Sequence, residues 1–453
     1  MADTPHIPRT LGLTDLVLLS TVAIVNVNVV PPVGVFGRAT LLLWVLAWLA
    51  FFVPSAIAVL ALSKRYPGEG GVYLWARQHF GDLHGFVSGW CYWTNSLFYV
   101  PVLLVYLAGV VAFAGGERTA ALVDDKWFVG SVAFGWLALI TVANIRGMGV
   151  GKWINNIGGV GGMATVVLVA LAAAFARWNG TSTTPALAAG SFFDMSGGLG
   201  VMCFAFIGIE LASTMSDEIR HPERDVPRAV AITGVVALLA YLLVADALLA
   251  LVPPGELGAI QGVMQAVQLG ADAAGAGWLV APIALVMALS IGGSASAWVA
   301  GPSRIPVVAG IDHLLPPALG RLHPRWGSPY VALLTCAAIS AGLTALSMTG
   351  SSVAEAYQML LRAAVVINLV PFVYTFLALL TLDTARPFER VAGAVGTVVT
   401  ALGILAVFLP TGEVGNVATF ELKMVAAVMG PIALGLWVFW RARGAGSTVR
   451  GDE

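Results

Sequence analysis

Long apolar runs separated by short polar connections extend along almost the whole chain. Each run holds about 20 residues or more, the length that an α-helix needs to cross the hydrocarbon core of a bilayer. The runs lie near residues 13–36, 40–63, 83–114, 127–145, 154–176, 193–216, 226–252, 276–305, 329–348, 355–382, 391–410 and 421–441. No alternating pattern typical of barrel strands accompanies them, and backbone groups in lipid need partners within their own segment. The pattern predicts an all-α polytopic membrane protein with about 12 transmembrane helices.

The amino-acid composition also indicates a chain that lies mainly in lipid rather than in water. Apolar residues make up 58% of the chain and charged residues 10%, whereas soluble domains contain about 45 to 50% and 25%. The cysteines Cys91, Cys203 and Cys336 all fall within apolar runs, which favours packing over a disulfide framework or a metal cluster. The polar segment 1–10 lacks the features of a secretory signal, and we expect it to remain as an N-terminal segment.

The distribution of basic residues predicts the orientation. Most of the 23 Lys and Arg residues fall in alternate connections, among them Lys64, Arg146, Arg220 and Arg386. Basic residues are retained on the cytoplasmic side of membrane helices. We therefore expect a multi-pass protein of the cell (inner or plasma) membrane whose two termini, including the short tail 442–453, are cytoplasmic.

The first apolar run contains features that break a helix. Asn26-Val27-Asn28 is followed by Pro31 and Pro32 in the middle of the run. Proline removes a backbone donor and disfavours helix in the residue before it. Unpaired backbone at membrane depth is tolerated around a cavity, so this break is a candidate for solute binding. The alternative is a proline kink whose asparagine side chains bond to neighbouring helices.

The sixth run holds a glycine and an ionisable carboxyl, Gly208 and Glu210, within the stretch Phe204 to Glu210. A charged carboxylate in hydrocarbon is costly unless it is neutralised, paired or facing water. Burial disfavours the charged form, so protonation of Glu210 is expected to respond to solute or to conformation. The alternative is a glutamate locked to hydroxyls or backbone as a structural clamp.

The spacing of these two breaks suggests an internal repeat. About five spans separate the two broken helices, and repeats with an odd number of spans insert with opposite topology. We expect an inverted-repeat core over residues 11–382, with the second repeat starting near residue 193 and two further helices at residues 391–441. Free amides of one half-helix and free carbonyls of the other would suit a zwitterion.

Several motifs resemble the amino acid/polyamine/organocation transporter superfamily. They are Leu11 to Val17, Pro67 to Tyr73, Phe204 to Glu210 with the following stretch Asp217 to Pro227, and Trp298 to Arg304. The resemblance extends over nearly the whole chain and is greatest to the bacterial glutamate/GABA antiporter branch. It implies a five-plus-five inverted-repeat (LeuT-like) core, alternating access, no cofactor, and a monomer or homodimer. Its expected partners are a small-molecule substrate and the lipid bilayer, with no nucleic acid.

The same resemblance implies a set of site residues. Backbone amides at Val27 and Asn28 would hold a substrate carboxylate, and carbonyls at Phe204 and Ile207 would hold its amine. Phe204 matches an aromatic lid, and Glu210 matches a proton-sensitive carboxyl. The remaining side-chain candidates for substrate binding are Asn26, Asn95, Trp298 and, as the best of the secondary candidates, Asn368.

Two positions depart from the family pattern. Asn26-Val27-Asn28 stands where Gly-x-Gly is usual, so side-chain amides could bind solute in place of a close backbone approach. Gly162 stands where proton-coupled relatives place a lysine, which favours exchange or facilitated movement. Coupling to sodium is a further alternative, with the hydroxyls of Ser290, Ser294 or Ser296 as ligands, although small residues in membrane helices more often serve packing.

Other functional classes fit the sequence less well. The six histidines lie in terminal or connecting positions without metal-ligand spacing, and no P-loop or nucleophile elbow occurs, which argues against an enzyme. The ionisable residues do not form the ring that a channel filter needs. We predict an exchanger of an amino acid or related zwitterion. A polyamine or organic-cation transporter is the alternative, disfavoured because Glu210 supplies little negative charge, and a sodium-coupled symporter is a further one.

Overall fold

The computed structural model describes residues 9–34, 36–68, 70–182, 192–214, 218–253, 256–311, 314–349, 353–409 and 417–449. Outside these ranges lie most of the predicted N-terminal segment 1–10, the last residues of the predicted tail, and Glu69 and Asp217 of the family motifs. The described residues are mainly helical and form no strand; a single backbone bridge joins Leu11 to Ile219. The all-α class is confirmed.

Within the described chain, 10 helices are long and apolar enough to cross a membrane. One of them combines α3 (Ala39–Ala47), the π-helical turn η2 (Trp48–Phe52) and α4 (Val53–Arg65). The others are α6 (Asp82–Ala112), α8 (Lys126–Ile145), α9 (Met148–Trp178), α12 (Pro222–Leu251), α14 (Val280–Ala300), α16 (Tyr330–Ser347), α17 (Val353–Thr381), α18 (Pro387–Val407) and α19 (Val417–Val449).

The first and sixth predicted spans are the two that the structure interrupts. The first consists of α1 (Leu13–Ile24), the short turn η1 (Val27–Val29) and α2 (Pro31–Gly34). The sixth consists of α10 (Phe192–Ala205) and α11 (Leu211–Thr214). The 10 long apolar helices and these two interrupted segments correspond to the 12 apolar runs of the sequence, and the number of crossings stays a prediction.

Short helices connect the spans. The sequence prediction gave no helix to the connection that contains α13 (Gly262–Ala273). The remaining short elements are α5 (Val72–Phe80), η3 (Phe113–Gly115), α7 (Glu117–Ala120), η4 (Ala121–Asp124), η7 (Gly277–Leu279), η8 (Pro302–Arg304), α15 (Ile305–Ile311) and η9 (Pro317–Gly320).

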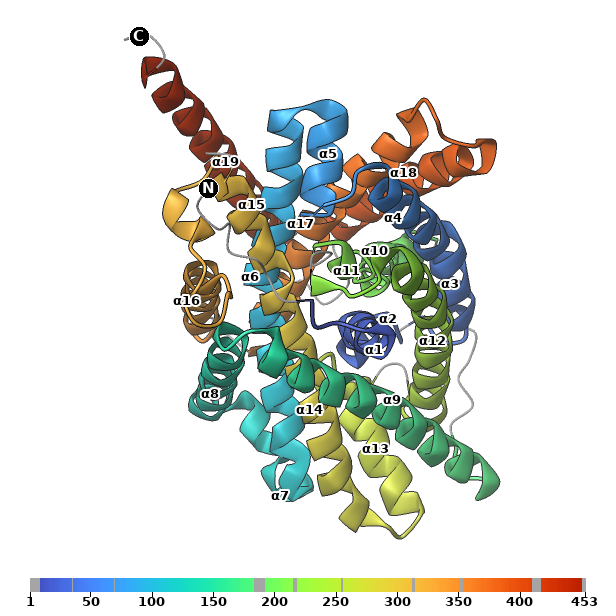
Figure 1. Cartoon of the computed structure of the whole chain (residues 1–453). Helices are drawn as coiled ribbons and strands as arrows, with labels where there is room; N and C mark the ends of the chain where they lie inside the picture. Colours follow the sequence, from blue (N-terminus) through green and yellow to red (C-terminus); the bar gives the residue numbers. More distant parts are fainter. Residues whose placement is uncertain are drawn as a thin grey trace.

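The interrupted helices lie at the centre of the molecule, encircled by long helices (Figure 1). Glycines permit this close packing. A Cβ on Gly158 of α9 would lie 2.7 Å from the Cα of Gly293 in α14, and one on Gly159 would lie 2.8 Å from the Leu18 carbonyl of α1. Small residues at such contacts let membrane helices approach closely. Helix α9 therefore packs closely against both α1 and α14.

Exposed apolar side chains cover the outer helices. On α9 they include Val160, Val167 and Leu171, which face away from the core. Trp127 and Trp178 are strongly exposed where α8 begins and α9 ends, as expected for tryptophans at a membrane interface. The surface of the described helices therefore fits a lipid environment.

Candidate functional site

The break in the first span is closed by its own Asn26 and by side chains of the surrounding helices. The Asn26 side chain donates from Nδ2 to the Ala23 carbonyl at 2.5 Å, and Trp298 of α14 donates from Nε1 to the same carbonyl at 3.3 Å. Ala23 belongs to the last turn of α1, whose carbonyls lack helical partners. Asn26 and Trp298, two predicted site residues, thus meet at the end of α1.

Asn28 connects the same break to α17. Its Nδ2 lies 3.3 Å from the Tyr357 hydroxyl, which in turn donates to the Asn28 carbonyl at 3.2 Å. The side-chain Oδ1 of Asn28 is buried and has no hydrogen-bond partner in the described residues. A buried acceptor without a partner is uncommon, so Oδ1 is available to a solute donor. Val27 is buried beside it in η1.

The break in the sixth span depends on a glycine. Helix α10 ends in tight turns, with the N–H of Ile207 donating to the Phe204 carbonyl at 3.0 Å. Gly208 then takes a φ of 141°, a conformation that L side chains rarely adopt. A Cβ there would also lie 2.8 Å from Ile24 Cγ1 and 3.0 Å from Ala23 Cβ. The two breaks therefore touch each other, and Gly208 is the point of contact.

Glu210 lies fully buried two residues after this glycine. Its Oε2 accepts the Gly208 N–H at 2.9 Å, and its Oε1 accepts the hydroxyl of Tyr92 from α6 at 2.9 Å. Hydrogen bonds to a carboxylate are stronger than neutral ones and offset part of the cost of burial. The carboxyl is thus held against its own helix break and against α6 at once.

Aromatic rings surround the next group of predicted residues. Tyr99 of α6 makes edge contacts with Phe204 at 4.8 Å and with Trp298 at 5.6 Å between ring centroids. Asn95 occupies the same face of α6, one turn before Tyr99 and one turn after Tyr92. Both polar atoms of the Asn95 side chain are buried without a partner among the described residues. An unsatisfied amide on the face of α6 that carries Tyr92 and Tyr99 is a candidate for contact with a small molecule.

Asn368 has the same character on α17. Its side chain is fully buried, and neither polar atom has a partner in the parts of the chain described. No hydrogen bond links it to either break within those parts. Its role in binding stays a prediction.

The serines considered as sodium ligands differ in whether their hydroxyls already have a hydrogen-bond partner. Ser296 accepts the Nδ2 of Asn144 at 3.0 Å, whereas the buried Ser294 hydroxyl has no partner in the described chain. A Cβ on Gly162 would lie 2.8 Å from Ser290 Oγ and 4.0 Å from the Val25 carbonyl in the first break. Gly162 therefore faces the first break, as its alignment with the family lysine position implies.

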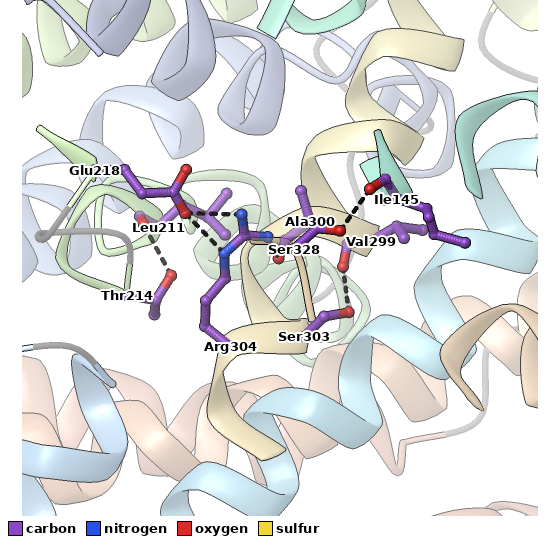
Figure 2. A network of polar contacts seen from close by, with 9 residues as sticks. All are labelled: Ile145, Leu211, Thr214, Glu218, Val299, Ala300, Ser303, Arg304 and Ser328. Atoms are coloured by element: carbon purple, nitrogen blue, oxygen red, sulfur yellow. Dashed lines mark hydrogen bonds and ion pairs between the residues drawn. The ribbon is translucent and has the colours of Figure 1, made fainter. Parts of the chain in front are cut away.

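A buried ion pair was missed by the sequence analysis (Figure 2). Arg304, which follows α14, donates from Nε and Nη2 to Glu218 Oε1 at 3.1 and 2.8 Å, and from Nη1 to the Ala300 carbonyl. Only 7% and 2% of the two side chains are exposed. The Glu218 carbonyl also accepts the N–H groups of Thr10 and Leu11 at 2.9 Å. Glu218 thus links three parts of the chain: the segment before α1, the segment after α11 and the end of α14.

Asp246 pairs with Arg177 at 2.8 Å, and both side chains are more than 40% exposed. Glu355 pairs with Lys423 at 3.3 Å, also at the surface. Sequence separation gave no means of choosing among these partners.

Comparison with known proteins covers almost the full chain. The amino acid permease family model matches residues 11–434. An uncharacterized transporter of Legionella pneumophila is 23% identical over 451 residues, covering 94% of this chain and 95% of that protein. A probable agmatine/putrescine antiporter of Lactococcus lactis is 23% identical, covering 84% and 82%. A branched-chain amino acid permease of Bacillus subtilis is 25% identical, covering 75% of each chain.

Proposed function

The chain belongs to the amino acid permease family of membrane transporters, and on this premise we propose that it exchanges an amino acid or a related zwitterion by alternating access. In this proposal the substrate binds between the two helix breaks. The carboxyl of Glu210 makes the exchange sensitive to protons. The protein acts in the cell membrane, with both termini in the cytoplasm and helices 1 to 10 forming two inverted repeats.

The observation that carries the proposal is the position of Glu210. Its carboxylate accepts hydrogen bonds from Gly208 in the break and from Tyr92 of α6. Protonation gives the carboxyl an O–H donor, so a proton on Oε1 would reverse the hydrogen bond with Tyr92 or weaken Oε1 as an acceptor. Proton binding would therefore change how the break of the sixth span is held against α6. This supports a proton-sensitive conformational step.

The ends of the half-helices support a zwitterion. Helix amides carry partial positive charge and helix carbonyls partial negative charge, and such ends at broken helices bind the charged groups of small solutes. The first break offers the N–H groups of η1, and the second offers the carbonyls at the end of α10. A substrate with one carboxylate and one ammonium group matches both.

An organic cation is the second candidate, and a specific observation favours it. Tyr99, Phe204 and Trp298 form a contiguous aromatic set, and aromatic faces attract cations. The relative from Lactococcus lactis carries the name of an agmatine/putrescine antiporter. Glu210 is the fully buried acidic side chain closest in sequence to this set, and its bonds to Gly208 and Tyr92 already occupy it. A single carboxyl supplies little negative charge for a polycation, so we place the zwitterion first.

The test is counterflow in proteoliposomes at about pH 5.5 and 7.5. Vesicles are preloaded with unlabelled leucine, glutamate, arginine or putrescine, and uptake of the labelled compound is followed for the wild type and Glu210→Gln. Glu355→Gln serves as the control because Glu355 is a surface carboxyl. We expect an amino acid to accelerate uptake, and we expect the pH dependence to disappear in Glu210→Gln alone. Acceleration by putrescine alone would replace the zwitterion with an organic cation, and pH dependence kept in Glu210→Gln would remove that role from the carboxyl.

A further inference from the structure

The hydroxyl of Tyr241 in α12 reaches both helix breaks. It donates to the carbonyls of Ile24 and Ala205, the latter at 3.0 Å, and it accepts the N–H of Asn26 at 3.4 Å. Ile24 is the last residue of α1, and Ala205 is the last residue of α10. A single oxygen therefore joins the carbonyl ends of the two half-helices.

Packing fixes the Tyr241 ring. The indole of Trp44 stacks on it with ring centroids 4.2 Å apart and an angle of 4° between the planes. Phe206 contacts it edge-on at 5.3 Å. The side chain is only 1% exposed. The ring is held in place, so the hydroxyl hydrogen is the part that remains able to turn.

The two carbonyls do not depend equally on this hydroxyl. A phenol has one hydrogen, so it donates fully to one carbonyl at a time. The Ile24 carbonyl has a second donor, the N–H of Asn26 at 2.7 Å. No second donor reaches the Ala205 carbonyl from the described residues. In the empty site, the tyrosine hydrogen is therefore needed at Ala205, because a buried carbonyl without a partner is costly.

We propose that Tyr241 is a positioning residue that satisfies the Ala205 carbonyl in the empty site and releases it to the ammonium group of the substrate. This inference rests on the proposed function. When the ammonium donates to Ala205, the tyrosine hydrogen bonds to Ile24 instead. Occupancy at the end of α10 is thereby transmitted to the end of α1. The ligand class is a primary ammonium that also carries a carboxylate.

The inference predicts how much the ammonium contributes to binding. In the wild type, the ammonium bonds to a carbonyl that Tyr241 already satisfies. In Tyr241→Phe, the same ammonium would satisfy a carbonyl that is otherwise buried without a partner. The dissociation constant of a deaminated analogue, divided by that of the amino acid, should therefore rise about fivefold in Tyr241→Phe.

The experiment measures this ratio in detergent micelles by titration calorimetry. The pairs are leucine with 4-methylpentanoate, glutamate with glutarate, and arginine with 5-guanidinopentanoate. Tyr106→Phe is the matched control because Tyr106 is a fully buried tyrosine whose hydroxyl has no partner in the described chain. We expect the ratio to be unchanged in this control.

A purely structural role for Tyr241 would weaken both members of a pair equally, and an unchanged ratio would overturn the inference. If none of the three amino acids binds the wild type, the proposed function fails and this inference fails with it.

Should Tyr241→Phe not fold, 3-fluorotyrosine is incorporated at position 241. It keeps the ring and is a stronger donor, so the ratio should then fall below the wild-type value. A ratio equal to or above the wild type would contradict the proposal.

Discussion

The two helix breaks touch each other but are stabilised by different means. The first contains no glycine and is closed by neutral groups, namely its own Asn26 with Trp298 of α14 at the Ala23 carbonyl, and Tyr357 of α17 at Asn28. The second turns at Gly208 and is closed by its own carboxyl, Glu210. The first break therefore depends on the helices around it, whereas the second contains its own ionisable group.

This difference separates two tasks that a transport site must perform. Neutral hydrogen bonds from several helices fix a geometry and do not respond to pH in the physiological range. A carboxyl within a break changes its hydrogen bonding when it binds a proton. We infer that the first break serves mainly to orient a solute and that the second serves mainly to respond to it.

The largest expected effect comes from breaking the buried Glu218–Arg304 ion pair, which links segments next to both breaks. Arg304→Met leaves the Glu218 carboxylate buried without its partner, and breaking such a pair costs about 3 to 5 kcal/mol. Thermal unfolding in detergent micelles would measure the loss. Arg177→Met is the control, because its pair with Asp246 is exposed and is worth about 1 kcal/mol or less. Equal losses in the two variants would contradict a special role for the buried pair.

The next effect concerns the second break alone. Gly208→Ala imposes a side chain on a φ of 141° and brings a Cβ within 2.8 Å of Ile24. Backbone strain of about 1 to 3 kcal/mol adds to the cost of overpacking. We expect counterflow per folded molecule to fall at least about tenfold.

Gly342→Ala is the control for this substitution, because a Cβ there meets no atom within 4 Å. Val27→Ala tests the first break in the same assay, and we expect a smaller loss because no positive φ is required there. A loss in Val27→Ala that matches the loss in Gly208→Ala would remove the difference between the breaks.

The breaks were predictable because their causes are local. Pro31 cannot donate a hydrogen bond, and Gly208 permits a positive φ, so each residue marks its break without help from the rest of the fold. Glu210 was predictable for a similar reason, since a carboxyl in an apolar run needs an explanation. The ends of most long helices lie within a few residues of the ends of the apolar runs, whereas α9 and α19 extend well beyond theirs.

The partners of these groups were not predictable. Tyr92, Tyr241 and Tyr357 lie in apolar spans where a tyrosine is an ordinary packing residue, and only the fold brings their hydroxyls to the breaks. The Glu218 to Arg304 pair joins residues 86 positions apart. Helix α13 was missed because Gln265, Gln268 and Asp272, which lie outside its buried face, divide the apolar run along the sequence. The inverted repeat and the orientation in the membrane stay predictions.

A smaller effect distinguishes charged from neutral closure. Tyr92→Phe removes a donor to the Glu210 carboxylate, and Tyr357→Phe removes a hydroxyl that makes two neutral hydrogen bonds with Asn28, one with its side-chain amide and one with its carbonyl. Hydrogen bonds to charged groups contribute about 1.5 to 3 kcal/mol and neutral ones about 0.5 to 1.5 kcal/mol each, so the two variants should lose similar stability. Tyr92→Phe alone should change the pH dependence of counterflow, which Tyr357→Phe should leave as it is. An unchanged pH dependence in Tyr92→Phe would remove the link between this hydrogen bond and the proton response of Glu210.

The smallest expected effect tests whether an ion assists the first break. The Ser294 hydroxyl is buried, and it has no partner among the described residues. If no ion binds there, Ser294→Ala removes an unsatisfied polar group and should change the free energy of unfolding by at most about 0.5 kcal/mol, or raise it slightly. If sodium uses this oxygen, the substitution would instead abolish a sodium-dependent rise in the unfolding temperature. Ser296→Ala is the matched comparison, because it removes a hydroxyl that already accepts from Asn144 and should destabilise the protein with or without sodium. We expect the wild type to show no sodium-dependent shift, because the first break is closed by neutral side chains that need no cation to hold them.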